Sequence, residues 1–249
     1  MSKITFDTTP LRSKWVECLY EDLSQELRDY LREAQPRYEH DLAIINSFLQ
    51  NGQLLELGSY PYCMSYFLRC LGFSVTGLDI KVSRANKLLN RHQINVLECD
   101  IEKESFPFVG QSFDLVVCNE VIEHLRINPL HTLAEIKRCL KRDGILMLTT
   151  PNLYGVTMLL RFLSGKGIED PVAAFKKYEK TGHMGHLRTY AKHDIQNMLN
   201  ESGFEVVAYT NRPLLTGSLR KIARKQLLYK FIPAALHDNH VFIARLMER

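Results

Sequence analysis

The stretch LLELGSYPY, residues 54–62, determines how the rest of the chain is interpreted. LLEL is an apolar run with one acid, which is typical of a buried strand, and Gly58 follows it as in a turn beneath a nucleotide-type cofactor. Only one glycine is present, because Tyr60 and Tyr62 occupy positions where a dinucleotide-binding turn has further glycines. The stretch predicts a cofactor turn whose tyrosines either pack under the next helix or line the pocket.

Short apolar runs recur along the chain after this turn. Helix-like segments separate several of them, which is the rhythm of βαβ units. The sequence predicts an α/β, Rossmann-like fold with a seven-stranded, mostly parallel sheet and helices on both faces. The last strand is expected to be antiparallel and to close an edge. The expected strands are residues 53–58, 73–80, 94–100, 113–119, 144–151, 204–210 and 240–246.

Residues 11–50 have a helical pattern. Apolar residues stand at four-residue steps from Trp15 to Leu31, and Pro36 is expected to end this helix before a second one begins. Because the apolar face is too narrow to form a core alone, residues 1–50 are predicted to form a helical lid over the cofactor. Residues 51–249 are predicted to form the main domain.

Composition excludes several classes of protein. A chain of 249 residues, 45% hydrophobic and 24% charged, is long enough to bury one full core. A net charge of +4 does not by itself indicate a nucleic-acid-binding protein. The six cysteines form no CxxC pair, which favours reduced thiols over a zinc cluster. With no signal-peptide pattern and no spanning apolar run, we expect a cytoplasmic protein.

Acidic residues stand where the first strands end. Glu56, Asp79 and Asp100 end or follow three of them, and Asn119-Glu120 ends the fourth. In an open parallel sheet ligands bind beyond these strand ends. Acids there suit a ligand with hydroxyls and an amine edge, whereas a triphosphate would require the absent GxxxxGK[ST] loop.

These motifs resemble the class I S-adenosylmethionine (SAM) dependent methyltransferases over roughly residues 50–247. Segments 113–125, 140–152 and 185–207 are similar to a subgroup that includes ubiquinone-biosynthesis O-methyltransferases and enzymes acting on sugars. The resemblance implies SAM as cofactor, with an acid on the ribose hydroxyls and another near the adenine. The implied cofactor-binding residues are Glu56, Gly58, Asp79, Ile80, Asp100, Ile101 and Asn119. A non-catalytic binding protein of this fold and a nicotinamide-dependent oxidoreductase are the alternatives, the latter disfavoured by Tyr60 and Tyr62.

The motif NEVIEHL, residues 119–125, carries the candidate catalytic groups. If a helix begins here, Glu120, Glu123 and His124 share one face. E-x-x-E-H resembles metal-binding motifs of ubiquinone and small-RNA O-methyltransferases, and in the RNA family a later histidine completes the site. His186 fits that position better than His183. These four residues are the expected ligands of a divalent metal (Mg, Mn or Zn), or else His124 and His186 act as general bases.

The resemblance implies O-methylation of a hydroxyl on a small molecule, a sugar or a lipid-linked glycan, with RNA 2′-O-methylation as an alternative. Nucleic acid is the less favoured partner because no base-stacking motif is present. The insert 152–187 is expected to select the substrate. The basic amphipathic segment 217–236 either contacts an anionic membrane peripherally or is a solvated crossover helix.

Overall fold

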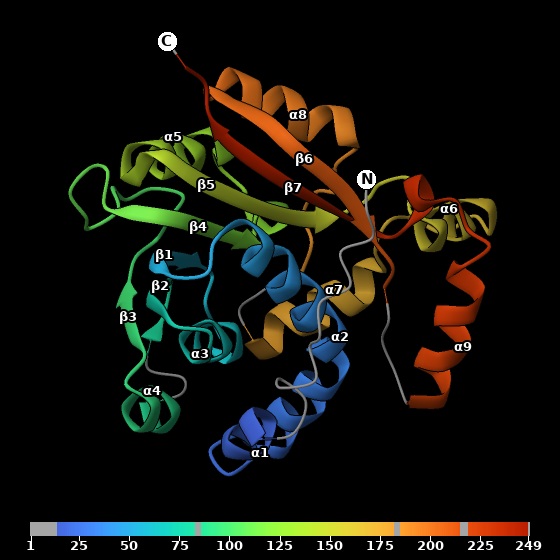
Figure 1. Ribbon diagram of the computed structural model, residues 1–249. Coiled ribbons are helices and arrows are strands. Elements are labelled where there is room, and N and C mark those ends of the chain that lie inside the picture. The colour runs from blue at the N-terminus through green and yellow to red at the C-terminus, as the bar shows by residue number, and fades with distance from the viewer. Residues whose placement is uncertain (1–13, 83–85, 182–184, 215–218, 249) are drawn as a thin grey trace.

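A seven-stranded sheet forms the centre of the computed structural model, which describes residues 14–82, 86–181, 185–214 and 219–248 (Figure 1). The strand order is β3-β2-β1-β4-β5-β7-β6. All seven predicted strands are confirmed, and the fold is the expected Rossmann-like one. The strands are β1 Gly52–Leu57, β2 Phe73–Asp79, β3 Asn95–Glu98, β4 Phe113–Asn119, β5 Leu140–Pro151, β6 Phe204–Arg212 and β7 Asn239–Leu246.

Strand β7 is antiparallel to both of its neighbours, β5 and β6. Its direction was predicted correctly, but its expected place at an edge was wrong, since β6 is the edge strand. The physical reason is burial on both faces. Val241 and Ile243 pack on one face of the sheet, and Phe242 and Ala244 pack on the other. Such a continuous apolar strand requires a neighbour on each side and a helical layer on each face.

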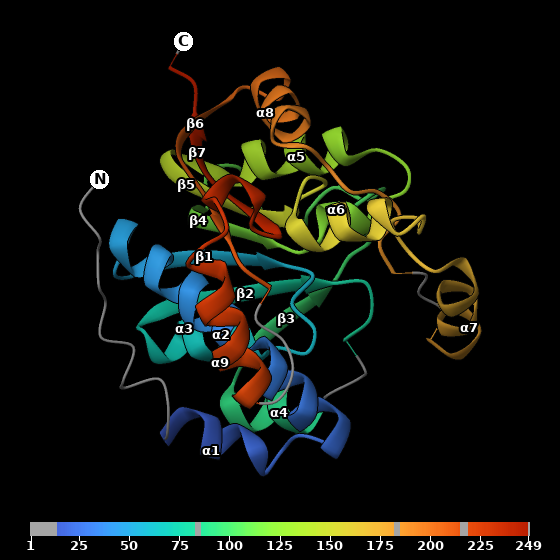
Figure 2. The same ribbon diagram turned by 90° about the vertical axis from the view of Figure 1, so that its right-hand side faces the viewer.

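Helices cover both faces of the sheet, as Figure 2 shows. Helices α5 (Pro129–Cys139) and α8 (Lys192–Glu201) pack on one face, and α3 (Cys63–Cys70) and α4 (Asn86–His92) pack on the other. Alternate residues of the same strand separate into these two layers. Leu54 joins the α3 side, for example, while Leu55 joins the α5 side.

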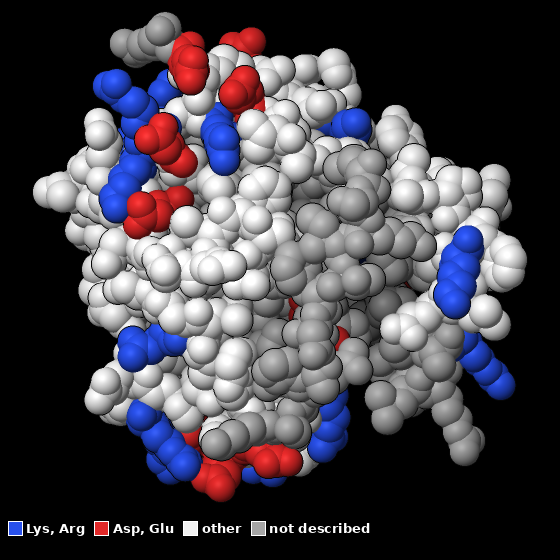
Figure 3. Space-filling view, viewed as in Figure 1, with Lys and Arg blue, Asp and Glu red and all other residues white. Residues whose placement is uncertain are grey.

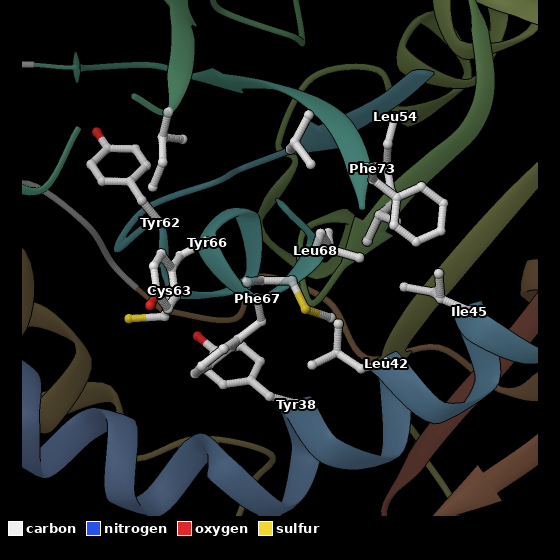
Figure 4. Packing of buried hydrophobic residues seen from close by; sticks show 14 of the residues in the cluster. Tyr38, Leu42, Ile45, Leu54, Tyr62, Cys63, Tyr66, Phe67, Leu68 and Phe73 are labelled. Atoms are coloured by element: carbon white, nitrogen blue, oxygen red, sulfur yellow. The ribbon is translucent and has the colours of Figure 1, made fainter. Parts of the chain in front are cut away.

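The two N-terminal helices share the core on the α3 side. α1 (Lys14–Tyr20) and α2 (Gln25–Phe48) meet at a short turn, and Ser24 caps α2 by accepting a hydrogen bond from Leu27 N at 3.3 Å. The helical chain is interrupted at residues 21–24 and Pro36 lies inside α2, so the predicted single helix from Trp15 to Leu31 and its end at this proline are both wrong. Proline removes one hydrogen bond of the helix, while the same helix buries Tyr38 and Leu42 against α3 (Figure 4). Tertiary packing therefore outweighs the local preference.

The remaining helices lie in the insert 152–187 and in the basic segment 217–236. α6 (Val156–Leu163) and α7 (Pro171–Thr181) belong to the insert, and α9 (Leu219–Tyr229) precedes β7. Two 3₁₀ turns, η3 (Ile122–His124) and η4 (Ala234–Leu236), complete the described elements. In the part of the chain that the structure describes, no helix has the length and apolarity required to cross a membrane. On the face in Figure 3, acidic side chains gather at the upper left and at the bottom, beside lysines and arginines.

Candidate active site

The predicted cofactor turn is tightly packed. Gly58 has φ of +62°, and a Cβ atom there would lie 2.8 Å from Val121 Cγ2, so only glycine fits without strain. The turn therefore touches the segment that carries Glu123 and His124. Tyr62 is fully buried in the core on the α3 side, whereas the Tyr60 ring lies edge-on to it and is partly exposed. The sequence left open whether these tyrosines pack under the next helix or line the pocket. Tyr62 packs in the core, whereas Tyr60 lies near the surface.

Asp79 is buried at the end of β2 and supports this turn. Its carboxylate accepts hydrogen bonds from Tyr60 N at 2.9 Å and from Lys81 N at 3.3 Å. The neighbouring Ile80 is 60% exposed, which leaves an apolar surface at the strand end where a ring would stack. An acid with an exposed apolar neighbour is the arrangement expected for holding a nucleoside.

The third strand end is arranged differently. Asp100 accepts from Glu102 N at 3.2 Å and pairs with Lys103 at 2.8 Å, and these contacts lower its pKa. Ile101 is buried, and its carbonyl accepts a hydrogen bond from Thr132 Oγ1 at 2.9 Å. The carboxylate of Asp100 is thus held within its own turn at the edge of the site.

Of two further predicted cofactor residues, Glu56 is buried and Asn119 is half-buried. Glu56 accepts a hydrogen bond from Ser65 Oγ, and burial raises the pKa of Glu56 to about 8. Asn119 donates to Asp41 Oδ2 of α2 at 3.2 Å, while its own Oδ1 is buried and has no hydrogen-bond partner. A buried acceptor without a donor costs free energy, so Asn119 Oδ1 is suited to receive a donor from a ligand.

Three predicted catalytic side chains converge beyond the end of β4. Glu123 Oε1 lies 4.0 Å from His124 Nε2 and 3.9 Å from His186 Nε2. One ligand atom from each residue lies within 4.8 Å of those of the other two. Glu123 is fully buried, its Oε1 has no hydrogen-bond partner, and burial, reinforced by Glu120, raises its pKa well above the usual range. The alternative His183 lies outside the described residues.

Backbone contacts hold the insert against this group. Leu187 N and Arg188 N both donate to the Glu123 carbonyl, at 2.9 and 3.2 Å. His124 Nδ1 lies 2.7 Å from the Gly185 carbonyl, so this nitrogen is the protonated donor and a neutral His124 turns its Nε2 lone pair toward Glu123. Thr150 Oγ1 donates to Glu123 Oε2 at 3.1 Å. Two segments far apart in the sequence are thereby fixed at one point.

Glu169 is a carboxylate of the insert that sequence reasoning did not single out. Its Oε1 accepts the backbone N–H of His186 at 3.0 Å and lies 3.5 Å from His186 Nδ1. Burial lowers the pKa of His186, and Glu169 opposes that shift. Asp170 and Pro171 begin α7, and Asp170 accepts hydrogen bonds from the first-turn backbone. The acid-acid-proline start of a helix was the sequence signal that could have drawn attention to Glu169.

Glu120 is not brought into this group. The backbone at Glu120 has φ of +56° and a 3₁₀ turn follows, so the expected shared helical face does not form. Its carboxylate instead accepts from Arg212 at 2.7 Å, from Thr149 at 2.8 Å and from Asn239 at 3.0 Å. Arg212 Nε also lies 3.2 Å from Asp41. Glu120 thus belongs to a buried ionic network that joins α2 to the sheet.

A cavity of about 120 Å³ opens beside this network, between α2 and the end of β6. Side chains of both signs of charge line the cavity: Arg37 and Arg212 are basic, and Glu33 and Glu120 are acidic. Arg37 donates to Tyr30 OH at 2.7 Å and lies over the Tyr38 ring. The cavity can receive a small group that carries both a donor and an acceptor.

A methyltransferase domain family matches residues 21–209 of this sequence. The chain belongs to that family. Its methyl donor is SAM, and the protein is therefore a SAM-dependent methyltransferase, as the resemblance implied. It is 26% identical to the ubiquinone biosynthesis O-methyltransferase of Glaesserella parasuis over 65% of this chain and 70% of that protein. An uncharacterised protein of Methanocaldococcus jannaschii is also 26% identical; the match covers 64% of this chain and 65% of that protein, just under two thirds of its length.

Solved structures share the fold of this methyltransferase. A SAM-dependent methyltransferase of Thermotoga maritima, described as a possible histamine N-methyltransferase, has a TM-score of 0.60 at 16% identity, covering 92% of this chain and 99% of that one. The 1,6-didemethyltoxoflavin-N1-methyltransferase of Burkholderia thailandensis, with bound S-adenosylhomocysteine, also has a TM-score of 0.60, at 14% identity, covering 100% of this chain and 94% of that one. At these identities the likeness concerns the fold alone.

Proposed function

We propose that this protein transfers a methyl group from SAM to a hydroxyl oxygen of a small molecule, a sugar or a lipid-linked glycan. The observation that carries the proposal is the convergence of Glu123, His124 and His186 next to the cofactor turn. An amine needs little activation before it attacks an electrophilic methyl group. A hydroxyl must lose its proton, so a cluster of bases beside the donor favours an oxygen acceptor.

The chemistry requires alignment and removal of one proton. The acceptor oxygen attacks the methyl carbon of SAM, the bond from that carbon to sulfur breaks, and S-adenosylhomocysteine leaves. His124 suits the proton transfer because its Nδ1 donates to the Gly185 carbonyl, which leaves Nε2 as the basic nitrogen. The positive charge of the imidazolium that results favours ionisation of the buried Glu123, 4.0 Å away, and the ionised carboxylate in turn stabilises the imidazolium. Holding donor and acceptor in line supplies much of the remaining rate.

The same three residues fit a divalent cation. Each turns a lone-pair atom toward a common point, and Glu123 Oε1 is buried without a donor, so a positive charge between them relieves both the repulsion and the desolvation. Ligands about 2.1 Å from a tetrahedral zinc ion stand about 3.4 Å apart. The two Glu123–histidine separations are 3.9 and 4.0 Å, and all three ligand atoms lie within 4.8 Å of one another. Side-chain rotations therefore have to bring the ligands closer when an ion binds.

As the alternative to proton transfer by His124, we propose Glu123, His124 and His186 as the ligands of a metal, without Glu120; His124 Nε2 would then bind the ion instead of acting as the base. Two imidazoles and one carboxylate suit Zn²⁺, Mn²⁺ or Fe²⁺ better than Mg²⁺, which prefers oxygen ligands. When bound, such an ion lowers the pKa of a hydroxyl that coordinates it. Glu169 then acts as a positioning residue, because it contacts the Nδ1 side of His186 while Nε2 faces the site.

Methyl transfer to a panel of acceptors tests the proposal. The protein is incubated with methyl-labelled SAM and with a catechol, a sugar diol, a ribonucleoside, an RNA and a primary amine, and product label is measured. We expect label in one of the hydroxyl compounds. His124→Ala should lower kcat by about 10²–10⁴-fold, which is the usual contribution of a general base.

His193→Ala is the matched control, because His193 is an exposed histidine of α8 whose ring is hydrogen-bonded to Asn197 of the same helix. It should leave turnover unchanged. Label found only in the amine would contradict oxygen transfer, and full activity of His124→Ala would contradict the assigned site. Label in RNA alone would favour the 2′-O-methyltransferase alternative.

A further inference from the structure

Helix α6 lies on the side of the molecule to which β4 and β5 direct their carboxyl ends (Figure 1). It exposes large apolar side chains to solvent. None of its eight residues is buried. Leu160 and Phe162 are more than half exposed, and Leu163 is 85% exposed. A helix this apolar is normally covered in a soluble domain.

The end of α9 exposes similar residues on the same side, which faces the viewer in Figure 2. Leu227 and Leu228 are more than half exposed, and Phe231 just after the helix is 80% exposed. Tyr229, between them, is buried and donates a hydrogen bond to Asp238, so the segment is anchored to the fold. These apolar groups therefore project from a fixed helix end.

Both segments are basic and contain no acid. Residues 152–168 contain Arg161 and Lys166 but no Asp or Glu. Residues 213–236 contain five basic residues and likewise no acid. Among those that the structure describes, Lys166, Arg224 and Lys230 are exposed. The whole sequence holds 28 acidic residues, so the absence of acidic residues from both segments distinguishes these two segments from the rest of the chain.

We propose that this surface, formed by α6 with residues 164–166 and by residues 224–231 of α9 and its end, docks on an anionic lipid bilayer. Exposed Leu and Phe side chains enter the interface between headgroups and acyl chains, and the neighbouring lysines and arginines attract anionic headgroups. Because the surface lies on the ligand side of the sheet, docking turns the active site toward the membrane. The inference does not depend on the identity of the acceptor.

Charge and side-chain type favour lipid over the other occupants. A second copy of this chain would bring the same positive charge to the surface, which opposes self-association. A nucleic-acid surface is expected to carry aromatic side chains for base stacking. Among the exposed large apolar residues of the proposed surface, Phe162 and Phe231 are aromatic and Leu160, Leu163, Leu227 and Leu228 are aliphatic.

Vesicle flotation of the full chain tests the proposal. The protein is mixed with phosphatidylcholine vesicles prepared with and without phosphatidylglycerol, at low and at high salt. We expect binding to the anionic vesicles that is at least about tenfold stronger than to neutral ones and that weakens with salt. Leu163→Ser with Phe231→Ser should weaken this binding by about tenfold or more. Arg224→Glu with Lys230→Glu should weaken it similarly and remove the dependence on phosphatidylglycerol.

The controls lie near the amino ends of the strands. Val109→Ser replaces an 80% exposed apolar residue before β4, and Arg142→Glu reverses an exposed charge in β5. Both should bind vesicles like the wild type. Equal binding to both kinds of vesicle, no binding, or binding unaffected by the surface variants would overturn the proposal. So would sedimentation equilibrium showing a dimer that the surface variants dissociate, or RNA binding that they abolish while vesicles remain unbound.

Discussion

Glu123 Oε1 lies 3.9 Å from His186 Nε2, although Glu123 follows β4 and His186 lies near the end of the insert that follows β5. The backbone ties this pair together, since the segment after His186 donates to the Glu123 carbonyl. The separation is too long for a hydrogen bond and suits an ion shared by the two groups.

The first prediction concerns metal affinity. Titration of metal-free protein with Zn²⁺ or Mn²⁺ in a calorimeter should show one site. Glu123→Gln and His186→Ala should each abolish it, because each removes one of three ligands. Glu120→Gln should retain it, because Glu120 faces Arg212. An equal loss of metal binding in Glu120→Gln would support the four-ligand site expected from the sequence.

Glu169 gives the second prediction. Glu169→Gln keeps an oxygen for the His186 N–H but removes the charge beside Nδ1. Metal affinity should fall by about 10–100-fold, as is usual for an orienting partner of a ligand, with the KM for SAM unchanged. Glu179→Gln, on the exposed part of α7, is the control. A rise in the KM for SAM with no change in metal affinity would show that Glu169 does not act through His186.

Asp79 gives the third prediction. Asp79→Ala should weaken SAM binding by about 1.5–3 kcal/mol, the usual contribution of hydrogen bonds to a charged group, measured by calorimetry. Because Asp79 also accepts from Tyr60 N, the circular dichroism and melting temperature of the variant must be compared with wild type. Asp114→Ala is a matched control, since it too removes an acid that accepts a backbone N–H, from Gln53. Unchanged SAM affinity in Asp79→Ala would remove Asp79 from the cofactor site.

The fourth prediction concerns the stability of the buried ionic network. Arg212→Met leaves the carboxylates of Asp41 and Glu120 without their cation. Loss of one partner from a buried group of charges costs about 3–5 kcal/mol of unfolding free energy, which urea denaturation would measure. Arg32→Met removes an exposed pair with Asp29 and should cost less than about 1 kcal/mol. Similar costs for the two variants would show that the network contributes little.

The fifth prediction concerns pH. The pKa of Glu56 is about 8 in the folded protein, above the ordinary 4.5, so folded Glu56 keeps a proton that the unfolded chain has released. Between those values the free energy of unfolding falls as pH rises, by up to about 1.4 kcal/mol per pH unit from this group. Urea denaturation at pH 6 and pH 8 should show a smaller loss in Glu56→Gln. The buried Glu123 adds the same pH dependence to the wild type and to the variant. The difference between the two proteins in lost unfolding free energy therefore reports Glu56 alone. Equal losses in the two proteins would show that the pKa of Glu56 lies outside the interval from pH 6 to pH 8.

The centre of the sheet could be predicted because its strands contain apolar runs, such as the one ending in Asn119, and burial on two faces demands that composition. The break at Pro36 could not, because a local rule competes with the tertiary packing of Tyr38 and Leu42. The lid role of residues 1–50 stays a prediction.

The sequence indicated which residue types gather at the candidate site better than it indicated where each side chain points. Glu123, His124 and His186 converge as the pattern suggested, but a positive φ turns Glu120 away, and helical spacing cannot reveal a single backbone torsion. Arg212 was missed because its partners are distant in sequence and meet only in the folded chain.

The place of β7 in the sheet constrains how the protein is made. β6 pairs only with β7 among the described strands, and β7 is synthesised after it. Until residues 239–246 have left the ribosome, β6 has no neighbour and the buried edge of β5 is open to other chains. A nascent chain paused before this point is therefore a substrate for chaperones. A stop codon that removes these few residues would expose two strands rather than one.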